Sequence, residues 1–118
     1  MAQARAGAML SAHAPPALVN AVRQTMGRIH VDGYTQAARL LDQADLATDL
    51  RQLNCPVQVA SGGADTITAP AACDAVALEV GEDRHDLGPV GHACALEAAD
   101  AVNALAGLVP STTAESAP

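Results

Sequence analysis

The order of secondary-structure signals after residue 55 limits the possible folds of this chain more than any other feature. Two runs of strand-forming residues alternate with two helical patterns, in the order 57–61, 70–80, 84–87 and 93–108. Strands that alternate with helices of this length imply a parallel sheet whose crossover is right-handed. The sequence therefore predicts an α/β fold with two parallel strands and flanking helices. Because two strands alone cannot form a covered parallel sheet, we expect the rest of the sheet to come from a segment before residue 1.

The chain before residue 55 shows mainly helical signals. Helices are predicted at 15–29, at 34–43 and in a short segment after the capping residue Asp45. Asp32 and Gly33 are expected to separate the first helix from the second, because glycine and aspartate disfavour helix interiors. Residues 1–12 are rich in alanine and only weakly patterned, so no element is predicted there.

The composition restricts the size of the core. The chain has 118 residues, of which 50% are hydrophobic, but alanine dominates this set and Tyr34 is the only aromatic residue. Such side chains bury little apolar area, so we expect one small domain of marginal stability. The sequence has no apolar run of about 18 residues, so no membrane-spanning helix is predicted.

Charge and cysteine content indicate the class of partner and the compartment. A formal net charge of −7 argues against nucleic acid or an anionic membrane as a partner, because both attract basic surfaces. The three cysteines, Cys55, Cys73 and Cys94, are widely spaced and lack the paired spacing of a zinc site. We therefore expect a reducing, cytoplasmic location and no zinc site.

Two residues that suit acid–base chemistry follow the two predicted strands. Asp65 comes after the first strand and a Gly62-Gly63 turn, and His92 comes after the second strand. Because adjacent parallel strands end at the same edge of a sheet, we expect the two side chains to meet there. A carboxylate bonded to one ring nitrogen fixes the histidine tautomer and leaves the other nitrogen as a general base. Alternatively, Asp65 is a turn residue and His92 packs within its loop, without a chemical role.

At these residues the chain resembles the α/β-hydrolase family, nearest to small-molecule hydrolases of the enol-lactonase and esterase type. The matching segments read CPVQVASGGADTITAP and HDLGPVGHACALEAADAVNALAGL. A Pro-Val strand, a glycine turn, an Asp and a Pro fit the first block of the family. A Gly-His pair and an early glutamate in the next helix, Glu97, fit the second. The resemblance implies that Asp65 and His92 are the acid and histidine of a Ser-His-Asp triad, which hydrolyses an ester, lactone or related acyl bond of a small molecule. It implies neither a metal nor an organic cofactor.

The same resemblance implies a division of the chain into three parts. Residues 1–44 would be the end of a helical cap, residues 45–109 the C-terminal part of the hydrolase core, and residues 110–118 a disordered tail. The G-x-S-x-G motif that surrounds the nucleophile of the family is absent from this sequence. We therefore expect the nucleophile to come from an earlier segment, and this chain alone to be inactive.

Other interpretations stay open. A truncated, non-catalytic fragment or a small interaction module would keep the features of the fold without the activity. One unpaired edge of strand 57–61 predicts self-association. His85 and Asp86, on the second strand, are expected at the surface. The arginines of the cap segment can attract an anionic substrate or be ordinary solvated residues; they are Arg5, Arg23, Arg28 and Arg39.

Overall fold

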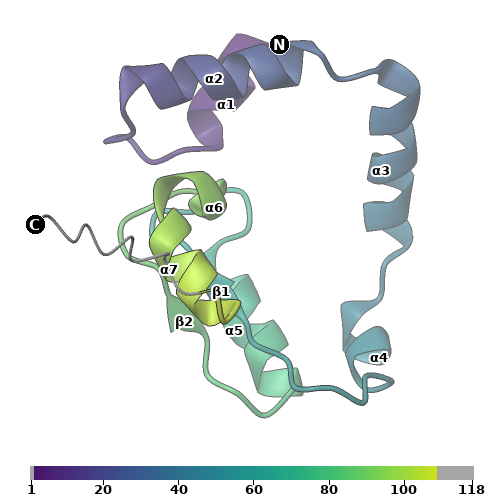
Figure 1. The fold of residues 1–118 in the computed structure, drawn as a ribbon. Helices are drawn as coiled ribbons and strands as arrows, with labels where there is room; N and C mark the ends of the chain where they lie inside the picture. The colour runs from purple at the N-terminus through teal and green to yellow at the C-terminus, as the bar shows by residue number, and fades with distance from the viewer. Residues whose placement is uncertain (1, 109–118) are drawn as a thin grey trace, which may run out of the picture.

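The computed structural model describes residues 2–108, which form seven helices and two short strands (Figure 1). The elements are α1 (Ala2–Ala8), α2 (Pro16–Gly27), α3 (Val31–Gln43), α4 (Leu46–Leu50), β1 (Ala60–Ser61), α5 (Pro70–Glu79), β2 (His85–Asp86), α6 (Cys94–Glu97) and α7 (Ala99–Leu105). Figure 1 shows α1 and α2 as one layer, with the strands, α5, α6 and α7 grouped below them. The helices α3 and α4 connect the two groups. The tail predicted at 110–118 lies outside the described residues.

β1 and β2 are parallel neighbours, as the sequence predicts, and α5 makes the connection between them. The register pairs Ala60 with His85 and Ser61 with Asp86. The His85 N–H donates a hydrogen bond to the Val59 carbonyl at 2.8 Å, and the Leu87 N–H donates to the Ser61 carbonyl at 3.1 Å. The pairing thus extends to Val59 and Leu87. Each strand is shorter than predicted, because only this limited stretch of the two backbones lies in hydrogen-bonding register. The described chain is thus rich in helix with one parallel strand pair, an arrangement compatible with the α/β class.

The main hydrophobic core lies between α1 and α2. Ala6, Leu10 and Val22 are its buried residues, and partly buried apolar residues pack around them. α2 begins at Pro16, which suits the first turn of a helix. The sequence pattern at 1–12 does not predict α1. Its alanine-rich residues have high helix propensity, but they lack the periodic apolar face by which a helix is recognised.

The course of α3 corrects one prediction. The expected break at Asp32 and Gly33 is wrong, because both residues lie inside α3, which begins at Val31. The break falls instead at 28–30, and Asp32 stands in the first turn, where a negative charge interacts favourably with the helix dipole. No residue of α3 is buried, and Figure 1 shows this helix to one side of both groups.

Single residues define the ends of α4 and α5. Asp45 caps α4 by accepting a hydrogen bond from the Thr48 N–H at 3.2 Å, as predicted. α5 begins at Pro70 and stops before Gly81, whose φ of 74° is easily adopted by glycine. The predicted helix at 93–108, by contrast, is divided into α6 and α7 at Ala98, whose φ and ψ of −131° and 46° are not helical.

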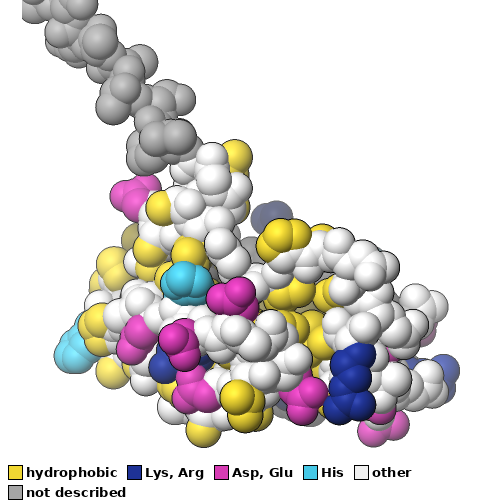
Figure 2. Space-filling view, turned by 90° about the horizontal axis from the view of Figure 1, so that it is seen from below, with side chains coloured by type: hydrophobic (Ala, Val, Ile, Leu, Met, Phe, Trp, Pro, Cys, Tyr) yellow, Lys and Arg dark blue, Asp and Glu magenta, His cyan; other side chains and the backbone are white. Residues whose placement is uncertain are grey.

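Much apolar surface remains in contact with solvent. Large apolar side chains are exposed on several described helices: Val31, Leu40 and Leu41 of α3 and Leu78 of α5 are each more than 70% exposed. Hydrophobic side chains are visible over several parts of the face shown in Figure 2. This exposure agrees with the small core that the alanine-rich composition predicts. Among the described helices, none has both the length and the apolar character needed to cross a membrane.

Candidate active site

Glycines allow the loop after β1 to lie directly against the loop after β2. A Cβ atom on Gly62 would be 2.1 Å from the carbonyl oxygen of Val90, far closer than two such atoms can approach. The Gly63 N–H donates a hydrogen bond to the Gly88 carbonyl at 2.7 Å, and the Ala64 N–H donates to the Val90 carbonyl at 3.0 Å. These contacts fix the two loops against each other just before Asp65 and His92, the residues that the sequence predicts for the site.

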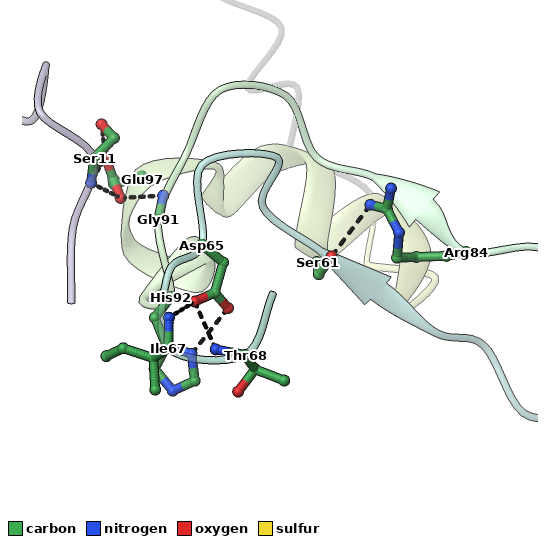
Figure 3. Close-up of polar contacts among 9 residues, drawn as sticks. All are labelled: Ser11, Ser61, Asp65, Ile67, Thr68, Arg84, Gly91, His92 and Glu97. Carbon is green, nitrogen blue, oxygen red and sulfur yellow. Dashed lines mark hydrogen bonds and ion pairs between the residues drawn. The ribbon is translucent and has the colours of Figure 1, made fainter. Parts of the chain in front are cut away.

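Asp65 and His92 form a hydrogen-bonded pair at this edge, the Asp65–His92 pair (Figure 3). Oδ2 of Asp65 lies 2.9 Å from Nδ1 of His92. The other oxygen, Oδ1, accepts hydrogen bonds from the backbone N–H groups of Ile67 at 2.8 Å and Thr68 at 3.0 Å. The Asp65 side chain is 6% exposed and the His92 side chain 33% exposed. The predicted meeting of the two side chains is confirmed, and their catalytic roles stay a prediction.

The surroundings of Asp65 favour its ionised form. Burial alone would raise the pKa of Asp65, but hydrogen bonds from His92, Thr68 and Ile67 outweigh burial and lower the pKa below its ordinary value. Because an ionised carboxylate only accepts hydrogen bonds, the neutral His92 ring carries its proton on Nδ1. The lone pair of Nε2 is then free to accept a proton, and none of the described residues hydrogen-bonds to that atom.

Glu97 links the loop that carries His92 to the layer formed by α1, α2 and the segment between them, called the helical layer below. Its carboxylate accepts hydrogen bonds from the backbone N–H groups of Gly91 at 2.8 Å and Ser11 at 3.0 Å, and from the Ser11 hydroxyl (Figure 3). Burial would raise the pKa of Glu97, yet these bonds lower it below its ordinary value. On the other side of His92, the N–H of the next residue donates to the Met9 carbonyl at 2.7 Å. The chain between α1 and α2 therefore holds the histidine loop on both sides.

A largely apolar cavity of about 770 Å³ lies between the helical layer and the Asp65–His92 pair. α1 and α2 form most of its wall, and Tyr34 of α3 also lines it. Ile67, two residues after Asp65, and Ala93, one residue after His92, line the end of the cavity nearest the pair. Asp65 and His92 themselves do not line the cavity. The volume is within the range of small-molecule sites, about 300–1,000 Å³.

Among the other residues that the sequence analysis considers, Arg5 lines the cavity, whereas His85, Asp86 and Cys94 do not. His85 and Asp86 are exposed on β2, as predicted. Cys94 begins α6 and is half-buried, and residues 2–108 contain no cluster of three or more metal-ligating side chains. Ser61, at the end of β1, is buried, and its hydroxyl accepts a hydrogen bond from the Arg84 guanidinium at 3.1 Å, so it is not available to the His92 ring.

Comparisons with known proteins do not assign the chain to a family. No family model, curated protein or solved structure matches it. The function proposed for the chain therefore depends on the geometry of the Asp65–His92 pair and on the cavity beside it.

Proposed function

We propose that the chain supplies the acid and the base of an acyl-hydrolysis site that acts on an ester, lactone or related bond of a small molecule. The observation that carries this proposal is the 2.9 Å contact between Asp65 Oδ2 and His92 Nδ1, which leaves Nε2 free. Two further features support it: the lowered pKa of the buried Asp65 carboxyl, and the apolar cavity beside the pair.

His92 acts in two steps in this proposal. Nε2 removes the proton from a hydroxyl group as the hydroxyl oxygen attacks the substrate carbonyl, and the Asp65 carboxylate stabilises the imidazolium that forms. When the tetrahedral intermediate collapses, Nε2 returns the proton to the leaving oxygen. Asp65 stays ionised and keeps the ring oriented, because its other oxygen is anchored by two backbone N–H groups.

The attacking hydroxyl is that of a serine outside residues 2–108. Among the described residues, no serine, threonine or cysteine side chain hydrogen-bonds to the His92 ring. The family resemblance implies that this serine belongs to an earlier segment. The chain alone is therefore expected to have little activity, while His92 can still act as a base for any hydroxyl group that reaches Nε2.

Methanol can replace the serine hydroxyl in a test of this base. The purified chain is incubated with p-nitrophenyl butyrate at neutral pH, with and without methanol, and the release of p-nitrophenol is followed. We expect the chain to accelerate the methanol-dependent reaction, and we expect this acceleration to fall at least about tenfold in His92→Ala and Asp65→Asn.

His85→Ala and Asp86→Asn are the matched controls, because both residues are exposed on β2 and have the same side-chain types. Neither control should change the methanol-dependent rate. A rate that survives unchanged in His92→Ala would remove His92 as the base.

A second candidate is a non-catalytic interaction module, and the exposure of α3 favours it. Val31 and Leu41 are 79% and 77% exposed, and no residue of this helix is buried. Exposed apolar surface of this kind is typical of protein interfaces. The methanol experiment separates the two candidates, since an interaction module would retain the Asp65–His92 pair without any His92-dependent turnover.

A further inference from the structure

The cavity beside the Asp65–His92 pair has one charged residue in its described wall, and that residue is basic. The chain holds 13 acidic and 6 basic side chains, yet Arg5 is the only charged residue among those that line the cavity. The other lining side chains are apolar, apart from Thr25 and the hydroxyl of Tyr34. A guanidinium in such a wall attracts an anion, because no carboxylate in the described wall competes for it.

Arg5 is held by an aromatic ring instead of a carboxylate. Its guanidinium donates a hydrogen bond to the Tyr34 hydroxyl, and its Cζ atom lies 5.7 Å from the centre of the Tyr34 ring. The ion pairs among the described residues involve Arg51, Arg84 and His92, and none of them includes Arg5. The tyrosine therefore orients the guanidinium while other N–H groups stay available to a ligand.

Arg5 lines one end of the cavity, and Ile67 and Ala93, which neighbour the Asp65–His92 pair in sequence, line the other. Arg5 reaches Tyr34 on α3, whereas Ala93, which also lines the cavity, immediately follows His92. Figure 1 shows α3 well to one side of α6, the helix that follows the histidine loop. Leu18 and Met26 of α2 both line the cavity, and the helix rises about 12 Å between them. An apolar molecule of medium chain length can extend between the two ends.

We propose that the cavity binds an amphiphilic anion, with its carboxylate at Arg5 and Tyr34 and its apolar body along α1 and α2. That this molecule is a substrate rests on the proposed acyl-hydrolysis site, in which the carbonyl to be cleaved lies at the end nearest His92. The substrate class is then an ester or lactone that keeps a free carboxylate at the far end of an apolar body. A neutral ester of the same length lacks the group that Arg5 recognises.

Tyr34 provides a direct probe, because it is the only aromatic residue of the chain and lines the cavity. Its fluorescence is titrated with decanoate, decan-1-ol and decyltrimethylammonium, which share one apolar chain and differ in charge. We expect decanoate to bind roughly tenfold to a hundredfold more tightly than decan-1-ol, as charge-assisted hydrogen bonds allow, and the cation to bind least. Equal affinities for decanoate and decan-1-ol would overturn the proposal.

Substitutions of the arginine complete the test. Arg5→Gln should lower the affinity for decanoate to that for decan-1-ol, whereas Arg5→Lys keeps the charge and should retain most of the preference. Arg39→Gln is the matched control, because Arg39 is exposed on α3 and does not line the cavity. A folded Arg5→Gln chain, verified by circular dichroism, that binds decanoate as tightly as the unaltered chain would overturn the proposal. If Arg5→Gln does not fold, the ligand series on the unaltered chain and on Arg5→Lys decides.

The result can be distinguished from that of the methanol experiment. Arg5-dependent binding of decanoate without His92-dependent turnover would support the anion site and remove the hydrolase. Turnover that depends on His92 without any preference for decanoate would support the hydrolase and remove this ligand class.

Discussion

Removal of the Glu97 carboxylate should separate the helical layer from the loop that carries His92. Glu97→Ala leaves the backbone N–H groups of Ser11 and Gly91 without the acceptor that they share. The two backbones are in direct contact at this point, since a Cβ atom on Gly91 would lie 2.6 Å from the carbonyl carbon of Leu10. The carboxylate therefore bridges two segments that are distant in sequence and closely packed in the fold.

The expected loss of stability follows from the number and kind of hydrogen bonds removed. A hydrogen bond to a charged group contributes about 1.5–3 kcal/mol, so the two backbone bonds together contribute about 3–6 kcal/mol. Glu97 is only partly buried and water can solvate part of the exposed groups, so we expect Glu97→Ala to lower the free energy of unfolding by about 3 kcal/mol. Glu97→Gln keeps one acceptor oxygen and should lower it by about 1–2 kcal/mol.

Urea unfolding followed by far-ultraviolet circular dichroism measures this difference. Glu82→Ala and Glu82→Gln are the matched controls, because Glu82 is exposed and its side chain makes no hydrogen bond to the described residues. The expected order of stability is Glu82→Ala, then Glu97→Gln, then Glu97→Ala. A Glu97→Ala chain whose unfolding free energy lies within about 0.5 kcal/mol of that of Glu82→Ala would refute the bridging role.

Three further predictions concern pH, the glycine turn and association. The pKa values of Glu97 and Asp65 are lowered in the folded chain, so their contribution to stability is complete above the ordinary carboxyl pKa of about 4 and is lost as the pH falls through the lowered values. Urea titrations should therefore show a smaller loss of stability on acidification in Glu97→Gln than in the unaltered chain. An equal loss in the two chains would contradict a lowered pKa of Glu97. Gly62→Ala should destabilise the chain by more than about 2 kcal/mol, because its Cβ would meet Val90 at 2.1 Å, whereas Gly33→Ala has open space and should stabilise α3 by up to about 1 kcal/mol. Thermal unfolding compares these two variants, and equal melting temperatures would contradict the close approach. Sedimentation should show concentration-dependent association through the exposed apolar surface, reduced in Leu41→Lys; a monomer at every concentration would contradict this expectation.

Local signals in the sequence predict the elements whose ends depend on one residue. Pro70 and Gly81 mark the ends of α5, and Asp45 caps α4, because these effects act within one turn of helix. The parallel pairing of β1 with β2 follows from the alternation of strands and helices. The contact between Asp65 and His92 was predictable for the same reason, since the loops after adjacent parallel strands lie at one edge of the sheet.

Features that depend on tertiary contacts could not be predicted in this way. The bond between Glu97 and Ser11 joins residues 86 positions apart, and no pattern in either segment indicates the other. In the sequence, Glu97 stands out only as the early helix glutamate that fits the family resemblance. The break between α6 and α7 at Ala98 has no glycine or proline to signal it, and we attribute it to the bonds that turn Glu97 toward Gly91. The contact between Arg5 and Tyr34 likewise joins a segment without a predicted element to an exposed helix.

The protonation of the His92 ring nitrogens tests the central claim most directly. NMR of the chain with isotopically labelled histidine distinguishes a ring nitrogen that carries a proton from one that does not, and the exposed His85 provides an internal reference. At a pH where the ring is neutral, Asp65 should hold the proton on Nδ1 and leave Nε2 without one, and Asp65→Asn should abolish this preference. A His92 ring that carries its proton on Nε2 in the unaltered chain would contradict the account, because that nitrogen could not then accept a proton from a nucleophile.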